Sequence, residues 1–172
     1  MAKKYAAPVD QKLDREKTYV ATIETTAGTI VAELYPKIAP NHVNAFVFLA
    51  REGFYEGVIF HRVIPGFMIQ GGDPTGTGRG GPGYQFANEN KDSKRKFDAG
   101  TLAMANAGPD TNGSQFFIND AESPHLTPEN YTIFGHVKDG QDVVKAIANA
   151  ERDENDRPRQ EIKIESVTVE EK

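Results

Sequence analysis

Polar and apolar residues alternate through residues 18–34, near the start of the chain. A period of two is typical of β-strands that bury one face, because successive side chains point to opposite sides. A short turn, Thr26-Ala27-Gly28, interrupts the alternation near its middle. The pattern predicts a β-hairpin whose buried face carries Tyr19, Ala21, Ile23, Ile30, Ala32 and Leu34.

Two later segments change to the helical period. In "APNHVNAFVFLAREG", residues 39–53, apolar residues recur every three or four positions, with Pro40 near the start and Gly53 just past the end. Proline in the first turn and glycine after the last turn are typical helix boundaries. The segment "DGQDVVKAIANA", residues 139–150, has a shorter stripe of the same kind. We expect two helices that each pack one apolar face on the rest of the protein.

Short β-rich pieces separated by glycine-rich turns fill the chain between these helices, at residues 58–60, 63–70, 101–105, 115–119 and 131–137. The final segment, "EIKIESVTVEE", changes the parity of its apolar residues at Glu165-Ser166, which predicts a β-bulge. The fold class is therefore mainly β. We expect a closed antiparallel eight-stranded β-barrel capped by two α-helices, because closure removes exposed sheet edges.

Length and composition favour one domain. The 172 residues, of which 38 % are hydrophobic, suffice for one core. Residues 1–17 are polar and aperiodic, so we interpret them as an N-terminal extension, either loose or wrapped over a domain at 18–172. Cysteine is absent, which excludes disulfides, thiolate zinc sites and cysteine nucleophiles.

The charge balance argues against nucleic acid as a partner. Acidic residues outnumber basic ones by 25 to 20, giving a formal charge of −5 that repels phosphate backbones. The basic run "KDSKRK", residues 91–96, is interpreted as a solvated loop, with an adaptor role for it as an alternative. No apolar stretch has the length of a signal peptide or a membrane span, so we expect a cytoplasmic protein without a membrane partner.

Several familiar motifs are present without the context that their chemistry needs. "GTGRGG", residues 76–81, matches a dinucleotide-binding loop, but Pro82 follows and no helix begins there. The four histidines form no close pair of the helical zinc type, and Ser114 lacks a nucleophile-elbow pattern. We therefore expect no nucleotide, no metal and no cofactor.

Two segments combine apolar and polar residues in an unusual way: "FHRVIPGFMIQGGD", residues 60–73, and "AMANAGPDTNGSQFFI", residues 103–118. A bend at Pro65-Gly66 would bring Arg62 to the same surface as the residues that follow the bend. In the second segment Phe117 and Phe116 fall on opposite faces of a short strand. From the pattern alone, a surface site and an ordinary core with polar strand ends remain equally good interpretations.

The same two segments closely resemble the signature blocks of the cyclophilin family of peptidyl-prolyl cis/trans isomerases, and the resemblance extends from about residue 18 to residue 169. It implies a barrel with the active groove on its outer surface and Arg62 as the catalytic residue. It also implies a pocket for the substrate proline ring, formed by Phe67, Met68, Phe117 and Leu126. The groove for the peptide backbone would be formed by Gln70, Ala105, Asn106 and Gln115.

Two further substrate-binding positions depart from the pattern of eukaryotic members. His125 stands where they carry tryptophan, and Tyr131 stands where they carry a pocket histidine, as in bacterial cyclophilins. The resemblance implies cyclosporin as a ligand, but a weak one, since the missing indole supplies a hydrogen bond and apolar area.

We thus expect a monomeric isomerase that acts on X-Pro bonds in proline-containing peptides and unfolded proteins and assists protein folding. The alternative is a chaperone or scaffold module that binds proline-containing peptides with little turnover. Arg62 discriminates between them, because a pure binder has little need for a cation beside an apolar pocket.

Overall fold

A computed structural model describes residues 3–172 of the chain. Its elements follow the order β1 (Tyr19–Thr25), β2 (Gly28–Leu34), α1 (Pro40–Arg51), β3 (Phe60–Ile64), β4 (Met68–Gly71), β5 (Thr101–Met104), β6 (Phe116–Asn119), β7 (Ile133–Asp139), α2 (Gln141–Ala148) and β8 (Ile164–Glu171). The predicted class, mainly β with eight antiparallel strands and two helices, is confirmed. The predicted strand at residues 63–70 is in fact two, because the chain turns at Pro65-Gly66.

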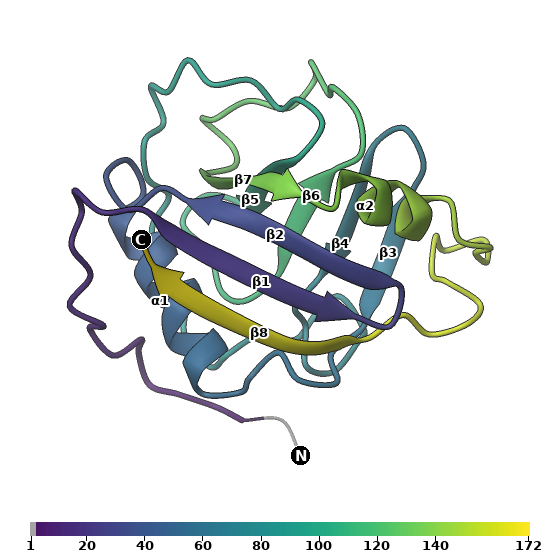
Figure 1. Ribbon diagram of the computed structural model, residues 1–172, viewed down its shortest axis with the longest axis horizontal. Coiled ribbons are helices and arrows are strands. Elements are labelled where there is room, and N and C mark those ends of the chain that lie inside the picture. The colour runs from purple at the N-terminus through teal and green to yellow at the C-terminus, as the bar shows by residue number, and fades with distance from the viewer. Residues whose placement is uncertain (1–2) are drawn as a thin grey trace.

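The eight strands form one curled antiparallel sheet in the order β3-β4-β6-β5-β7-β2-β1-β8 (Figure 1). The prediction of a closed barrel is not confirmed: the sheet is a half-barrel, because β3 and β8 do not pair as strands. Within residues 3–172 its two edges meet at the bridge between Ile59 and Lys163 and at the hydrogen bonds beside it, from the Phe60 amide to the Ile162 carbonyl at 3.0 Å and from the Ile164 amide to the Val58 carbonyl at 2.8 Å. The contact is short because it lies at the first residues of both strands, Phe60 of β3 and Ile164 of β8.

The predicted bulge in the last strand is present. Along β8, Ser166 pairs with Glu24 of β1, and the next pair joins Ile164 to Thr25, so Glu165 is the extra residue. The bulge turns both Ile164 and Val167 inward, where both are buried. Without it, one of them would face water.

The two helices lie at opposite ends of the curled sheet (Figure 1). Both were predicted, and α1 ends next to Gly53, which adopts a φ of +69° that suits glycine. Helix α1 packs beside β8, while α2 packs beside β2 through Val143, which lies over Gly28. Within residues 3–172, neither helix has both the length and the apolar character that crossing a membrane requires.

Alternation along the strands sorts their side chains into two apolar clusters. Residues such as Ile69, Phe116 and Phe134 belong to the main core inside the sheet, together with the buried face of α1. Their neighbours in sequence, such as Met68 and Phe117, belong to a second cluster on the outer face of β4, β5, β6 and β7. This outer cluster forms the floor of the candidate site.

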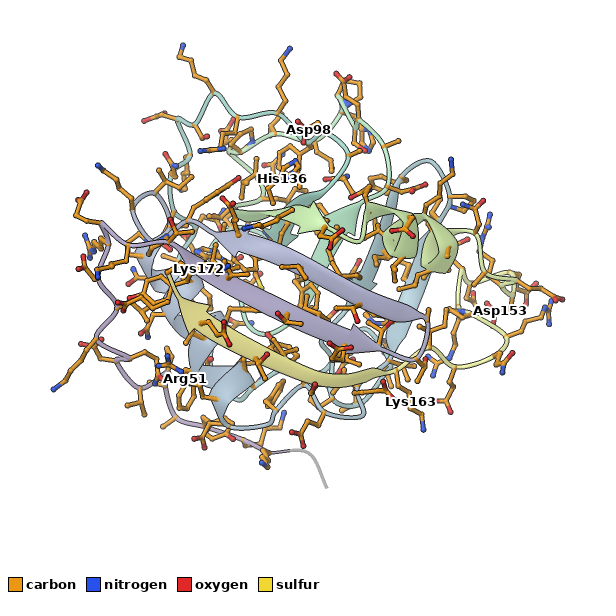
Figure 2. All side chains as sticks on the ribbon, viewed as in Figure 1. Arg51, Asp98, His136, Asp153, Lys163 and Lys172 are labelled. Carbon is orange, nitrogen blue, oxygen red and sulfur yellow. The ribbon has the colours of Figure 1, made fainter. Side chains whose placement is uncertain are left out.

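The N-terminal segment, residues 3–17, lies against the domain and runs along α1 (Figure 1). The ring of Tyr5 packs edge-on against Phe48, with ring centroids 5.0 Å apart. The Gln11 amide donates to Asn44 Oδ1 at 2.7 Å, and Arg51, labelled in Figure 2, donates to Gln11 Oε1 at 3.0 Å. The segment is thus wrapped rather than loose, while the boundary at residue 18 stays a prediction.

Candidate active site

A single row of side chains crosses four strands on the outer face of the sheet. Arg62 of β3 pairs with Gln70 of β4, Gln70 pairs with Phe117 of β6, and Phe117 pairs with Ala103 of β5. Residues directly opposite one another on paired strands project from the same face. The register therefore places a guanidinium, an amide and an aromatic ring side by side on a rigid surface.

A tight turn between β3 and β4 lets this row form. The Phe67 amide donates to the Ile64 carbonyl at 3.1 Å across Pro65 and Gly66, and Gly66 has a φ of +76°. Proline followed by a residue with positive φ is the signature of a type II turn. The Gly66 amide donates to Asp120 Oδ2 at 2.8 Å, which ties the turn to the end of β6. The bend predicted at Pro65-Gly66 is this turn.

A cavity of about 170 Å³ opens beside the row. Its volume lies below the range of about 300–1,000 Å³ that drug-sized ligands occupy, so it suits a small ring. Its lining combines an apolar floor with a cation and amides at the rim, and consists of Arg62, Phe67, Met68, Gln70, Ala105, Asn106, Phe117, Leu126 and Tyr131. All nine are among the eleven site residues that the sequence predicted.

The aromatic floor is held by edge and stacking contacts. Phe117 lies edge-on to Tyr131, with centroids 5.6 Å apart, and stacks on Phe97 at 6.2 Å. His125, one of the two predicted residues outside the cavity lining, lies beside Phe67 at 5.1 Å between ring centroids. His125 thus borders the cavity behind one of its walls.

Arg62 is exposed, and among residues 3–172 no hydrogen bond or ion pair engages its guanidinium. Arginine stays protonated beside apolar surface, and its planar fork offers five N–H donors. An uncommitted cation at the rim of an apolar cavity is therefore available to a bound molecule.

Gln115, the other predicted residue outside this lining, links the cavity to a neighbouring loop. Its Oε1 accepts a hydrogen bond of 3.0 Å from Gln70 Nε2, and its own Nε2 donates to the carbonyls of Gly78 and Gly80. The loop itself is organised by Asp73, which is fully buried. Asp73 accepts hydrogen bonds from four loop amides and two hydroxyls, from Thr75, Thr77, Gly78 and Gly80.

The pKa of Asp73 reflects this arrangement. Burial opposes its ionisation, but the hydrogen bonds outweigh burial and lower the pKa to about 2. The carboxylate is therefore charged at any physiological pH and holds the "GTGRGG" segment as a loop. No helix opens there, in agreement with the sequence.

A second, larger cavity of about 770 Å³ adjoins the first and shares Gln70, Ala105 and Asn106 with it. Its outer wall is formed by residues 78–85, and Lys4 of the N-terminal segment also lines it. The four residues predicted for the peptide-backbone groove, Gln70, Ala105, Asn106 and Gln115, all line this cavity, whereas Lys4 and residues 78–85 were not predicted there. The glycine-rich composition of residues 76–83 signalled a loop, but no local pattern connects Lys4 to that loop.

Two of the four histidines, His42 and His136, form contacts within the structure. His42 is buried, with Nδ1 2.6 Å from Glu89 Oε1, and His136 Nε2 lies 2.9 Å from Asp98 Oδ1 (Figure 2). Within the described residues, 3–172, no group of three or more His, Cys, Asp or Glu side chains is placed to hold a metal ion.

Comparison with known proteins identifies the fold and the family. Residues 20–169 match the family model described as cyclophilin type peptidyl-prolyl cis-trans isomerase/CLD. Peptidyl-prolyl cis-trans isomerase A of Mycobacterium tuberculosis is 49 % identical over 169 residues, covering 88 % of this chain and 92 % of the relative. The isomerase ppi1 of Schizosaccharomyces pombe is 50 % identical over 145 residues, covering 83 % and 93 %.

Among solved structures, a cyclophilin type isomerase of Cryptosporidium parvum, crystallised in the presence of the dipeptide Ala-Pro, superposes with a TM-score of 0.83 at 39 % identity. The match covers 88 % of this chain and 98 % of that one. The resemblance seen in the two signature segments is thereby confirmed. The chain belongs to the cyclophilin family of peptidyl-prolyl cis-trans isomerases.

Proposed function

We propose that the cavity of about 170 Å³ binds the proline ring of an X-Pro peptide and that Arg62 catalyses rotation about the preceding bond. The observation that supports this assignment is the row of Arg62, Gln70 and Phe117, in which an unengaged guanidinium borders an apolar ring-sized cavity. The family activity is prolyl isomerisation, and the residue roles are our assignment.

The reaction needs no covalent chemistry. An X-Pro bond prefers trans by only about 0.5–1 kcal/mol, but its rotation crosses a barrier of roughly 18–20 kcal/mol because twisting breaks amide resonance. Uncatalysed exchange therefore takes tens of seconds. A catalyst has to bind the twisted amide more tightly than either planar form.

Arg62 meets this requirement. In the twisted state the proline nitrogen regains its lone pair and becomes a hydrogen-bond acceptor, whereas the planar amide nitrogen is a poor one. A guanidinium N–H at the cavity rim donates to that nitrogen, and the bond exists only during rotation. Removal of about 7 kcal/mol from the barrier by this and the binding terms together would accelerate the reaction by about five decades.

The apolar walls hold the ring while the other side of the bond turns. Phe67, Met68, Phe117 and Leu126 clamp the ring, and Tyr131 closes the pocket beside Phe117. The side chain of Asn106 is already fixed, because it donates to the Asn130 carbonyl at 2.7 Å and accepts from the Gly108 amide at 3.1 Å. Its main chain is therefore positioned to hold the residues before the proline.

The substrates we propose are proline-containing segments of unfolded or flexible polypeptides, since the cavity is open and the Cryptosporidium relative was crystallised with Ala-Pro. We also propose that cyclosporin binds weakly, because His125 offers less apolar area than an indole. The cytoplasmic location and the monomeric state stay predictions from the sequence.

The test is magnetisation-exchange NMR on a short Ala-Pro peptide with the native protein, Arg62→Ala, and Arg159→Ala as a matched control. Arg159 is an exposed arginine that pairs with Glu151 at 3.5 Å, outside the cavity lining. We expect exchange to slow by about two decades or more in Arg62→Ala, while the peptide still shifts resonances of the cavity residues. The control should match the native protein.

The binding-module alternative gives a different result. In that case the native protein and Arg62→Ala would bind the peptide with the same affinity, and neither would accelerate exchange appreciably. Arg62 would then have no catalytic role, and the site would only bind peptides. Equal and fast exchange in both would place catalysis on other residues.

A further inference from the structure

The larger cavity is cationic in a protein that is acidic overall. Lys4 and Arg79 line it, and its lining within residues 3–172 includes no aspartate or glutamate. The whole chain carries a formal charge of −5. A local excess of positive charge in a cavity that adjoins the ring pocket therefore points to an anionic group on the bound molecule.

Lys4 is held at the cavity by several contacts. Its Nζ donates to the Gly81 carbonyl at 2.9 Å, and the next amide, of Tyr5, donates to the Pro82 carbonyl at 2.8 Å. The Tyr5 ring packs against Phe48 as described. A Cβ on Gly83 would lie 2.6 Å from the Tyr5 carbonyl oxygen, so glycine is required for this approach. The loop and the N-terminal segment fit each other closely.

Both cations keep donors for a ligand. An ammonium has three N–H donors, and one of Lys4's bonds Gly81, which leaves two. Arg79 uses its main-chain amide, which donates to Thr77 Oγ1 at 3.1 Å, and within residues 3–172 its guanidinium has no hydrogen-bond or ion-pair partner. The carboxylate of Asp73, which organises this loop, is buried and satisfied by the loop donors.

The shared rim fixes which part of a substrate reaches the larger cavity. Gln70, Ala105 and Asn106 line both cavities, so a peptide seated in the small one continues along them into the large one. With Asn106 on the residues that precede the proline, as proposed above, the larger cavity receives side chains upstream of the proline. Because the two cavities are adjacent and an extended chain advances about 3.3–3.6 Å per residue, we assign the larger one to the second and third residues before the proline.

We propose that the N-terminal segment takes part in substrate selection: Lys4, together with Arg79, makes the larger cavity a subsite for an acidic side chain two or three residues before the proline. This inference rests on the proposed orientation of the peptide in the isomerase site. Lys4 and Arg79 are specificity residues, and neither touches the rotating bond.

The test uses the full chain and two blocked peptides, acetyl-Ala-Glu-Glu-Ala-Pro-Phe-amide and its Gln-Gln counterpart, which differ in charge and little in shape. NMR titration gives Kd for each peptide, and magnetisation exchange gives the catalysed rate. The proteins are native, Lys4→Gln, the double variant Lys4→Gln/Arg79→Gln, and Lys3→Gln as the control. Lys3 lies outside the cavity lining and donates to the Glu52 carbonyl.

At low salt we expect the native protein to favour the Glu-Glu peptide by about fivefold, since each exposed charge pair contributes modestly. The preference should fall to about twofold in Lys4→Gln, vanish in the double variant and persist in Lys3→Gln. It should also shrink in 0.5 M NaCl, because salt screens exposed charges.

Equal Kd values for the two peptides with the native protein, or an unchanged ratio in the double variant, would overturn the proposal. Failure of the isomerase assignment is a separate result. The ratio of Kd values can be measured in Arg62→Ala as well, whereas loss of catalysis shows only in the exchange rate of the neutral Gln-Gln peptide.

Discussion

At the scale of single residues, the candidate site depends on strand register more than on loops. Arg62, Gln70 and Phe117 are each fixed by a strand, and their pairing sets their spacing. Sites built on strands hold their side chains more precisely than sites built on loops. His125 lies instead in a loop, where it borders the cavity beside Phe67.

The variant His125→Trp tests whether position 125 belongs to the ligand-binding surface. The variant should bind cyclosporin about tenfold more tightly, because an indole adds apolar area and an N–H donor beside Phe67. Titration calorimetry of native and variant protein measures the change. His125→Phe is the control, since it adds apolar area without the donor and should gain less. Equal Kd values for all three proteins would contradict the assignment of position 125 to the ligand-binding surface.

The residue pattern predicted two local features of the small cavity, the face of Phe117 and the turn before Phe67. Parity within short strands placed Phe117 opposite Phe116, and the Pro65-Gly66 pair signalled the turn that gathers Arg62 with the residues after it. The assignment to a binding groove came from the resemblance to cyclophilins. Asp73 was not predicted as the organiser of its loop, because its donors are mostly backbone amides that any sequence carries.

At the scale of elements, helix α1 is capped by a residue that is distant in the sequence and that the hydrophobic pattern does not reveal. Its first turn has no cap of its own, since Ala39 precedes Pro40. Glu89, from the long loop between β4 and β5, supplies it: one carboxylate accepts the amides of Asn41 and His42 at 3.1 and 2.8 Å. The same carboxylate accepts from His42 Nδ1 at 2.6 Å. A contact across 47 residues leaves no periodic trace in the sequence.

Glu89→Gln is expected to lower the free energy of unfolding by about 1–3 kcal/mol at pH 7, because a buried charge-assisted network loses its anion. Burial opposes ionisation of Glu89, but the His42 side chain and the two amides outweigh it, so the pKa of Glu89 lies below its usual value. The contribution of the Glu89 carboxylate to the free energy of unfolding is therefore complete above about pH 4.3, the pKa of glutamate in the unfolded chain. It disappears as the pH falls through the lower pKa that Glu89 has in the folded protein.

Urea denaturation of native and variant protein at pH 7 and at pH 3 measures this. The control is Glu56→Gln, which changes an exposed glutamate and should shift stability little. A difference between native protein and Glu89→Gln that is equal at both pH values would show that the cap acts through shape and not through charge.

At the scale of the whole molecule, the segment before β1 is part of the packed structure. Tyr5 contacts Phe48 and Phe54, and Leu13 packs against the same main core. Composition left open whether this segment is loose or wrapped over the domain, because its few apolar residues have no period. Only the structure, which places the core residues next to Tyr5 and Leu13, shows that these side chains pack on the domain. The open edge between β3 and β8 was missed for a related reason, since strand count does not fix how far two edge strands overlap.

Tyr5→Ala should lower the free energy of unfolding by about 1–3 kcal/mol, because a partly buried ring and its edge contact are lost. Val9→Ala is the matched control: Val9 is 60 % exposed and should change stability by less than about 0.5 kcal/mol. Thermal unfolding followed by circular dichroism compares the three proteins. Equal transitions for Tyr5→Ala and Val9→Ala would mean that the segment does not pack on the domain in solution.

The pairing of β1 with β8 also bears on how the chain is made. Strand β1 pairs with β2 through a turn of two residues, but its other edge pairs Tyr19 with Glu171. On the ribosome, β2 is available almost at once, whereas that second edge has no partner until residues 164–171 have emerged. An unpaired edge is a template for wrong pairing. A protein of a family that accelerates a slow step in the folding of others thus has, during its own synthesis, one edge of β1 without its partner until residues 164–171 have been made.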